Sequence, residues 1–235
     1  ILLFSLYIYI LIYNFNIKNN ILDYYNLNDP SYEILNNYYS YKQPILIKYK
    51  NISNYYNNFI NNEKKTKLNN NLNINPINNY YLYNILNCNK ILYPKNTLIN
   101  SFEYIISKKN DNLSWRYNLE EITNIIVLEG VLDIKINCFN NTNDLSNNLE
   151  YLYGVDYNNI FNINNIINNK DIVKKLNKNY IMLTLKKDSI ISIPREWVYN
   201  IHFTNKRNSC IIIKHRSIIN IMSIVKNYIE NKFKL

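Results

Sequence analysis

The C-terminal half of the chain is a succession of short β-type segments, and this feature most constrains the fold. In the segment 131–138, polar residues alternate with apolar ones, which is the period of a strand buried on one face. The segments of this character are 122–128, 131–138, 180–185, 189–193, 197–203 and 210–214. Many short strands with few helices predict a mostly β protein, either a small barrel or a sandwich. We also expect Glu129-Gly130 to close a tight hairpin between the first two segments.

Other elements are predicted on both sides of this region. Ser31 is placed to cap a short helix ending near Tyr39, and Pro44 opens a β-branched strand. Residues 80–83 form a further strand signal. The tail changes period, because its apolar residues fit one face of a helix. The predicted organisation is a connector over 18–30, a domain over 31–216 with a low-complexity insertion over 54–79, and a C-terminal helix over 217–235.

The N-terminal segment 1–17 carries no charge. As a helix it covers about 25 Å, slightly less than a bilayer core of about 30 Å. A cleaved signal peptide and a buried amphipathic element are the alternatives. However, no small-residue cleavage site follows, and residues 1–13 have no polar face. We therefore expect a membrane-anchor helix in contact with lipid, and a single-pass membrane location in the endomembrane system or mitochondrion.

Composition excludes several classes of function. The two glycines are too few for a Gly-rich phosphate loop, and the three cysteines form no CxxC pair of the kind that zinc ribbons need. The formal net charge of +10 favours anionic partners, but the lysines lie in small clusters and no nucleic-acid-binding motif is present. We therefore do not expect a nucleic-acid partner.

Three sequence motifs point to one family. The stretch Asn124-Ile-Ile-Val-Leu-Glu-Gly130 is followed by a strand, and Asp188-Ser-Ile-Ile-Ser-Ile-Pro194-Arg-Glu-Trp197 follows later. Both resemble the cupin-like JmjC family, and Lys42-Gln43-Pro44-Ile45-Leu46-Ile47 is similar to the entry strand of that family.

The resemblance extends over residues 31–216, including 152–165 and 180–193, which resemble the approach to the second motif. It implies a double-stranded β-helix, the jelly roll of cupin and JmjC domains. The expected fold class is therefore mostly β, with a few flanking helices and an N-terminal hydrophobic helix.

The resemblance also identifies candidate site positions. Members of the family are typically Fe(II)- and 2-oxoglutarate-dependent hydroxylases or demethylases, which bind iron through two His and one carboxylate. Matching the family's conserved Asn to Asn124 puts Asn118 and Glu120 on the H-x-D positions. The second His follows the motif's Trp by two residues and is Tyr199 here. Leu132 stands where the family has the Lys that binds 2-oxoglutarate.

These replacements argue against the reaction. A neutral amide and an un-ionised phenol are weak iron ligands, and a leucine cannot bind a carboxylate. The simpler cupin metal motif falls on Arg116, Asn118 and Thr123, which fit no better. The resemblance thus implies a degenerate pseudoenzyme without a cofactor, acting as a structural or interaction module for an unidentified protein partner. The alternative is an Fe(II)/2-oxoglutarate oxygenase with a misaligned or atypical metal site that includes Glu120.

We expect a polar network where the family holds iron. Period-two spacing puts Arg116, Asn118 and Glu120 on one face, with Tyr199 opposite. Because buried charges need partners, we predict an internal ion pair between Arg116 and Glu120. The alternative is a pocket that binds a small anion through the Arg116 guanidinium. The candidate pocket residues are Arg116, Asn124 and Trp197.

The two histidines are not expected to bind metal. His202 lies on the strand face opposite Tyr199, so it points away from the interior if Tyr199 points inward. His215 is expected beyond the end of its strand, as a core or surface residue.

Overall fold

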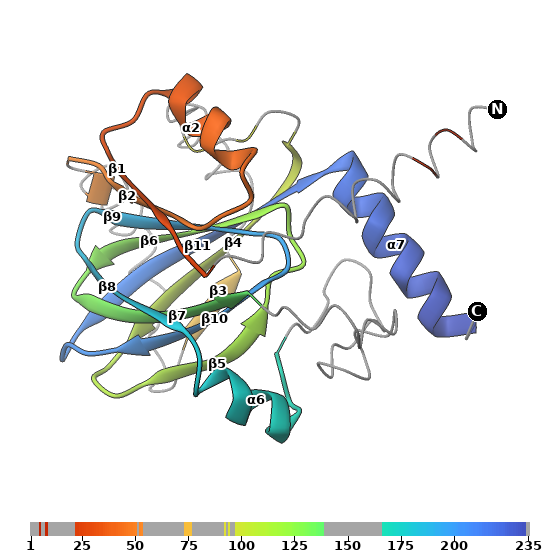
Figure 1. Cartoon of the computed structure of the whole chain (residues 1–235). Helices are drawn as coiled ribbons and strands as arrows, with labels where there is room; N and C mark the ends of the chain where they lie inside the picture. The colour runs from red at the N-terminus through yellow and green to blue at the C-terminus, as the bar shows by residue number, and fades with distance from the viewer. Residues whose placement is uncertain are drawn as a thin grey trace.

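The computed structural model describes residues 22–50, 52–53, 73–76, 92, 94, 97–138 and 166–233, together with Ser5 and Ile8. Within these residues the chain forms two facing β-sheets flanked by three helices (Figure 1). The mostly β prediction is thus confirmed. The predicted strand over 80–83 and the segment 152–165 lie outside the described residues.

The larger sheet has seven strands in the order β1-β2-β9-β6-β11-β4-β3. All its pairs are antiparallel except β1 with β2. The strands are β1 (Tyr25–Asn28), β2 (Ile45–Lys48), β3 (Asn73–Pro76), β4 (Thr97–Ser107), β6 (Ile122–Glu129), β9 (Ser189–Pro194) and β11 (Asn208–Ser217). Residues 73–76, predicted within a low-complexity insertion, thus form an edge strand on β4.

The smaller sheet has four antiparallel strands in the order β5-β10-β7-β8. They are β5 (Asn112–Tyr117), β7 (Val131–Cys138), β8 (Ile181–Lys186) and β10 (Trp197–Phe203). Strands β4 and β5 were not predicted from the sequence.

The main core fills the space between the two sheets. The predicted alternation in β7 is confirmed for Leu132, Ile134 and Ile136, which are fully buried in this core. It fails at the end of the strand, where Asn137 is the buried residue and donates to the carbonyl of Asn179 at 2.5 Å. Alternate residues of β10 point into the same core, so this strand faces the larger sheet as the pattern predicts.

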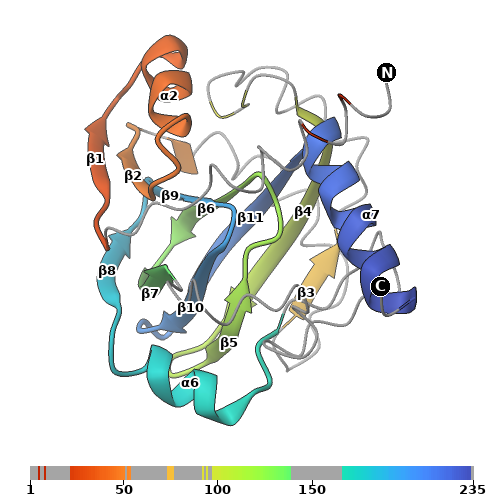
Figure 2. The same ribbon diagram turned by 45° about the vertical axis from the view of Figure 1, so that its right-hand side comes forward.

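Helices cover the outer faces of both sheets (Figures 1 and 2). Helix α2 (Tyr32–Tyr39) packs on the larger sheet through Leu35, and the predicted cap is confirmed because Ser31 Oγ accepts from the Ile34 backbone N–H. Helix α6 (Lys170–Leu176) begins at the capping residue Asn169 and packs on the smaller sheet. Part of the outer face of each sheet is therefore buried as well.

The expected hairpin at Gly130 is wrong. Strand β6 pairs with β9 and β11, whereas β7 pairs with β8 and β10, so the chain passes from the larger to the smaller sheet at this glycine. The physical reason is that β6 is a central strand, buried from Ile122 through Leu128. Both of its edges are already paired, so a tight turn here leads to the other sheet.

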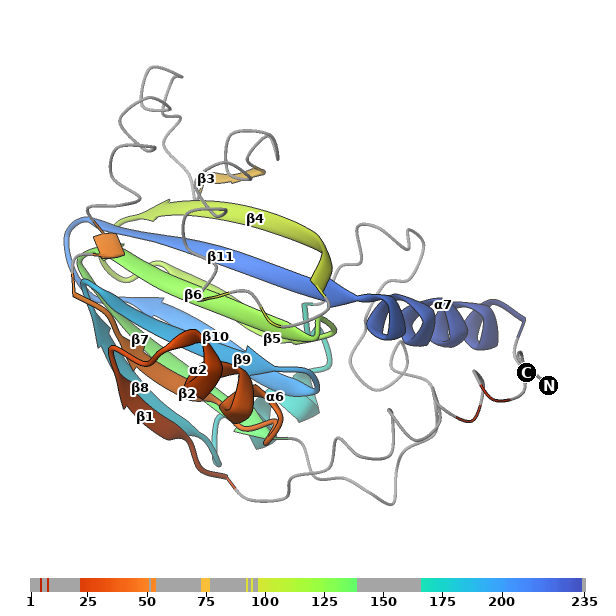
Figure 3. The same cartoon turned by 90° about the horizontal axis from the view of Figure 1, so that it is seen from above.

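The expected membrane location is also wrong. None of the helices in the described part of the chain combines the length and apolar character that a bilayer crossing requires. The longest of them is α7 (Ile218–Phe233), which lies within the predicted C-terminal helix and continues from β11 away from the sheets (Figure 3). Its 16 residues cover about 24 Å, less than a bilayer core. The predicted anchor helix over 1–17 lies outside the described residues, apart from Ser5 and Ile8.

Gly130 is required by its backbone conformation. Its φ is +87°, and an added Cβ would lie 2.6 Å from the Arg207 carbonyl oxygen and closer still to Asn208 Oδ1. We predict that Gly130→Ala lowers the free energy of unfolding by roughly 1–3 kcal/mol, measured by urea denaturation. The control is Asn110→Gly, at an exposed turn with φ of 70°, which should change stability by less than about 1 kcal/mol. An unchanged urea midpoint for Gly130→Ala would contradict this account.

Candidate functional site

A group of charged side chains lies between the two sheets, which we call the interior ion cluster: Glu103 of β4, Lys214 of β11, Arg116 of β5 and Tyr199 of β10. Arg116 lies directly opposite Tyr199 in the smaller sheet. Glu103 and Lys214 come from neighbouring strands of the larger sheet. The sequence thus brings together two cations, one carboxylate and one phenol from four strands.

Glu103 bridges the two cations. Its Oε2 accepts from Arg116 Nη1 at 3.1 Å, and its Oε1 accepts from Lys214 Nζ. The side chains of Arg116, Lys214 and Glu103 are 8, 14 and 18% exposed, so the cluster is largely removed from water. The Tyr199 hydroxyl is buried beside Arg116, and the two side chains interact. Neither the hydroxyl nor Arg116 Nε makes a hydrogen bond of normal geometry to a described residue.

The cluster keeps its charges at neutral pH. Burial raises the pKa of Glu103, but the nearby Lys214 and Arg116 outweigh this effect and hold the pKa below its usual value. Burial lowers the pKa of Lys214, but the Glu103 carboxylate reverses this and leaves the pKa above its usual value. Burial raises the pKa of Tyr199, so the phenol is neutral. The cluster therefore holds two positive charges and one negative charge.

Asn118 lies in the turn after β5, and other protein groups use its hydrogen-bonding capacity. Its Nδ2 donates to the carbonyls of Ile193 at 2.8 Å and Pro194 at 2.9 Å. Its Oδ1 accepts from Thr123 Oγ1 at 2.7 Å and from the Glu120 backbone N–H. The amide thus connects the β5–β6 turn to β9. Its donors and its acceptor are already used by these protein groups and are not available to a ligand.

The predicted ion pair between Arg116 and Glu120 is wrong. Glu120 accepts instead from Nε and Nη2 of Arg216, the latter at 2.7 Å, while Arg116 pairs with Glu103. Period-two spacing fails here because β5 ends at Tyr117, so Glu120 is in a turn and points to the end of β11.

Leu132 and Trp197 lie in the apolar core. Leu132 is wholly buried, in register with Phe203 on one side and Leu185 on the other. Trp197 is buried in the same core and donates from Nε1 to the Lys42 carbonyl at 3.2 Å. Neither side chain therefore offers a group that could bind the carboxylate of a ligand.

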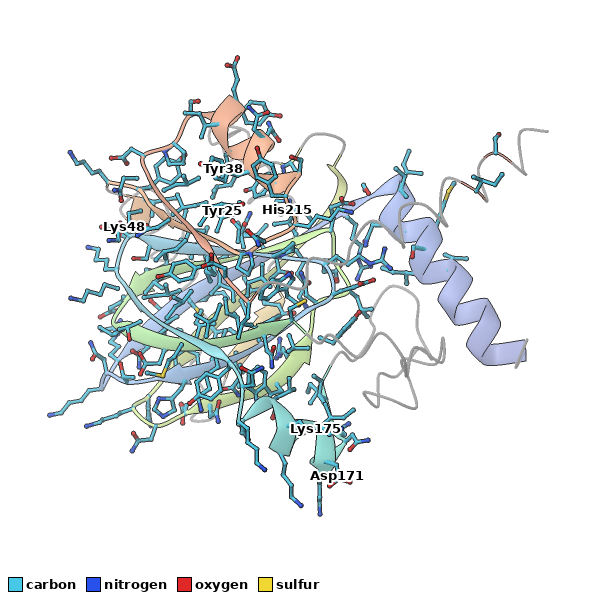
Figure 4. The ribbon with its side chains drawn as sticks, viewed as in Figure 1. Tyr25, Tyr38, Lys48, Asp171, Lys175 and His215 are labelled. Atoms are coloured by element: carbon cyan, nitrogen blue, oxygen red, sulfur yellow. The ribbon has the colours of Figure 1, made fainter. Side chains whose placement is uncertain are left out.

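Asn124 does not lie with Arg116 and Trp197. It is on the outer face of the larger sheet, beneath α2, where its Nδ2 lies 3.0 Å from His215 Nε2 and its Oδ1 accepts from Ser192 Oγ. We call Tyr39, Asn124, Ser192 and His215 the outer polar cluster (Figure 4 labels His215).

The outer polar cluster holds a neutral histidine. His215 is wholly buried, and burial lowers its pKa to about 3. With Asn124 Nδ2 as the donor, His215 Nε2 is the acceptor and the ring proton is on Nδ1. His215 lies inside β11 rather than beyond its strand as expected, and its reading as a core residue is confirmed.

The described donor groups do not fit Fe(II). Within the described residues, no three His, Cys, Asp or Glu side chains gather closely enough to hold a metal ion. His202 lies on the face of β10 opposite Tyr199, as predicted, whereas His215 is on the far side of the larger sheet. Glu120 is already held by two guanidinium donors from Arg216. Two histidines and a carboxylate therefore do not converge among these residues.

Glu103 and Lys214 were missed from the sequence. Lys214 follows three isoleucines in a strand and shares the inward face with Ile212 and Cys210. A lone cation at an inward position implies a buried anionic partner. That signal identifies Lys214, but Glu103 becomes its partner only through the pairing of β4 with β11, which the sequence does not reveal.

Comparisons with known proteins concern the fold alone. No family model and no curated protein matches this chain. The chain is similar to solved structures that include the Cnp3 cupin domain of Schizosaccharomyces pombe, at 10% identity and a TM-score of 0.36, covering 73% of this chain and 77% of that one. Another is an RmlC-like cupin family protein with a double-stranded β-helix fold from Methanocaldococcus jannaschii, at 9% identity and a TM-score of 0.31, covering 51% and 76%. A third, from Bacillus halodurans, has 9% identity and a TM-score of 0.31, covering 50% of this chain and 62% of that one.

The described residues form a mostly β fold with two facing sheets and a few helices, an arrangement consistent with a jelly roll.

The pair between Glu120 and Arg216 provides a stability test. Glu120 is buried and the Arg216 side chain is only 12% exposed, so removing Arg216 leaves a buried carboxylate without its partner. We predict that Arg216→Met lowers the free energy of unfolding by roughly 3–5 kcal/mol in urea denaturation. The control Arg207→Met breaks an exposed pair with Glu129 and should cost about 0–1 kcal/mol. Equal losses in the two variants would show that burial does not govern the cost.

The outer polar cluster predicts a pH dependence. The pKa of His215 is lower in the folded than in the unfolded chain, where it is about 6.5, so the unfolded chain binds more protons between these values. The contribution of His215 to stability is therefore present above pH 6.5 and falls by about 1.4 kcal/mol per unit as the pH decreases toward 3. We predict that His215→Gln lacks this slope, measured by urea denaturation at pH 7, 6 and 5. A wild-type-minus-variant difference that is constant across this range would contradict the prediction.

Proposed function

We propose that this chain is a degenerate cupin-fold domain related to the JmjC type, which has lost the iron and 2-oxoglutarate chemistry. It serves as a structural or interaction module for a protein partner, without a metal or organic cofactor. The observation that carries the proposal is the interior ion cluster of Glu103, Arg116, Lys214 and Tyr199.

The charge of the cluster opposes a metal. An Fe(II) site needs lone pairs and, usually, a negative ligand to offset two positive charges. Tyr199, one of the positions matched to an iron ligand, instead lies beside the Arg116 guanidinium. A net positive charge of the protein in a largely buried volume would repel a dication. The one carboxylate in the cluster, Glu103, already neutralises one of the two cations.

The other matched positions support the same proposal. Asn118 uses its amide to hold the β5–β6 turn, and Glu120 uses its carboxylate to hold Arg216. Leu132, at the position matched to the 2-oxoglutarate lysine, packs in the apolar core. Each position has a structural role that competes with ligand binding.

The alternative is an Fe(II)/2-oxoglutarate oxygenase that uses Glu120 with unusual partners. It requires Glu120 to leave a two-donor ion pair with Arg216, and two further ligands that the described residues do not place beside it. No contact in the described part of the chain favours it.

The experiment is anaerobic calorimetry of the full chain with Fe(II), or with Mn(II) as its substitute, with and without 2-oxoglutarate. We predict no metal binding up to millimolar concentration, and no effect of metal on 2-oxoglutarate binding. Metal binding that strengthens 2-oxoglutarate binding would overturn the proposal. The matched variant Glu120→Gln then identifies the site, because only an oxygenase built on Glu120 would lose that binding.

A further inference from the structure

The interior ion cluster has an excess of one positive charge, and two of its buried donor groups, Arg116 Nε and the Tyr199 hydroxyl, have no well-formed hydrogen bond to an acceptor among the described residues. We propose that the cluster is a binding site for a small monovalent carboxylate, held by Arg116, Lys214 and Tyr199. This inference goes beyond the proposed function, because it assigns a ligand class and does not depend on a metal.

The excess charge is the first argument. Arg116 and Lys214 are positive. Among the described residues, Glu103 is the carboxylate that pairs with them, and the neighbouring Glu120 is neutralised by Arg216. A charge without a counter-charge is costly in a largely buried volume, and an added anion would offset that cost. Because the excess is one charge, a monovalent anion balances it, whereas a divalent anion would leave a buried negative charge.

The free donors are the second argument. Buried polar groups are nearly always hydrogen-bonded, so an unpaired one calls for an explanation. Arg116 Nε and the Tyr199 hydroxyl are both buried, and their one polar contact among the described residues is with each other, without normal hydrogen-bond geometry. A phenol oxygen can accept from the guanidinium, but the hydroxyl proton still lacks an acceptor among these residues. They lie on neighbouring strands at one register position. A planar carboxylate has two oxygens that can accept from both donors, and guanidinium groups bind this shape well.

Burial sets the size of the ligand. Tyr199 and Arg116 are buried, while Glu103 and Lys214 keep a small exposed fraction, so the cluster is in contact with water at these two side chains. A small carboxylate can approach at these side chains, whereas a folded partner cannot place a side chain against Tyr199 without opening the sheets. The proposed carboxylate site is not at Leu132, the position matched to the 2-oxoglutarate lysine, which lies in the apolar core.

The experiment compares sodium acetate with sodium chloride at equal ionic strength, using thermal unfolding and calorimetry of the full chain. Because a ligand that binds only the folded state stabilises it, acetate should raise the melting temperature above the chloride value in a saturable way. Identical melting temperatures in the two salts, with no calorimetric binding, would overturn the proposal.

A pair of variants separates the site from the general positive charge of the chain. Lys214→Met removes the excess charge of the cluster and should abolish the acetate effect. Lys186→Met removes the same charge from an exposed position on β8 and should leave the effect intact. Equal loss of the effect in the two variants would show a non-specific response to net charge and would also overturn the proposal.

Glu103→Gln tests whether acetate affinity increases with the positive charge of the cluster. It raises the excess charge from one to two, so acetate should bind at least about tenfold more tightly than in the wild type. A cluster that is merely structural would be destabilised by Glu103→Gln with no change in acetate binding. Should this variant fail to fold, the wild-type titration and the two lysine variants still decide the outcome.

Discussion

The ion pair between Arg116 of β5 and Glu103 of β4 connects the smaller sheet to the larger one across the interior. Lys214 of β11 joins the same carboxylate, so three strands from two sheets meet at one group. Because each of these charges would be costly if left alone in a buried volume, the relative position of the sheets at this end is set by their pairing. The apolar core holds the sheets together elsewhere, whereas the ion cluster and the Asn118 amide require particular atoms to meet.

Successive polar residues of strand β11 point to opposite faces of the larger sheet. Lys214 and Arg216 share one face and serve the interior ion cluster and Glu120, whereas His215 between them belongs to the outer polar cluster. Strand β6 alternates in the same way. Thr123 on one face hydrogen-bonds to Asn118, and Asn124 on the other face contacts His215. A register shift of one residue would exchange these sets, so buried polar groups on both faces fix the pairing of β6 with β11.

The features predicted correctly from the sequence are those that depend on residues close together in the chain. The alternation in β7, the inward face of β10 and the Ser31 cap are properties of a few consecutive residues, and each was predicted from the sequence. The pairing of strands is decided by contacts distant in the chain, so the turn at Gly130 was assigned to a hairpin that does not form. The same limit explains the candidate site. Arg116 and Tyr199 were recognised as interior residues, but the partner of Arg116 is on β4, a strand that was not predicted.

The proposed loss of metal chemistry and the proposed preference for an anion have the same electrostatic basis. An iron site combines neutral and negative ligands around a cation, so the protein contributes negative potential to that volume. Here Arg116 and Lys214 exceed Glu103 by one charge, so the protein contributes positive potential instead. In this proposal, the field that would repel a dication from the interior is the same field that would attract a carboxylate. The charge of the whole cluster, rather than the identity of Tyr199 or Asn118 alone, therefore decides which kind of ligand this fold can accept.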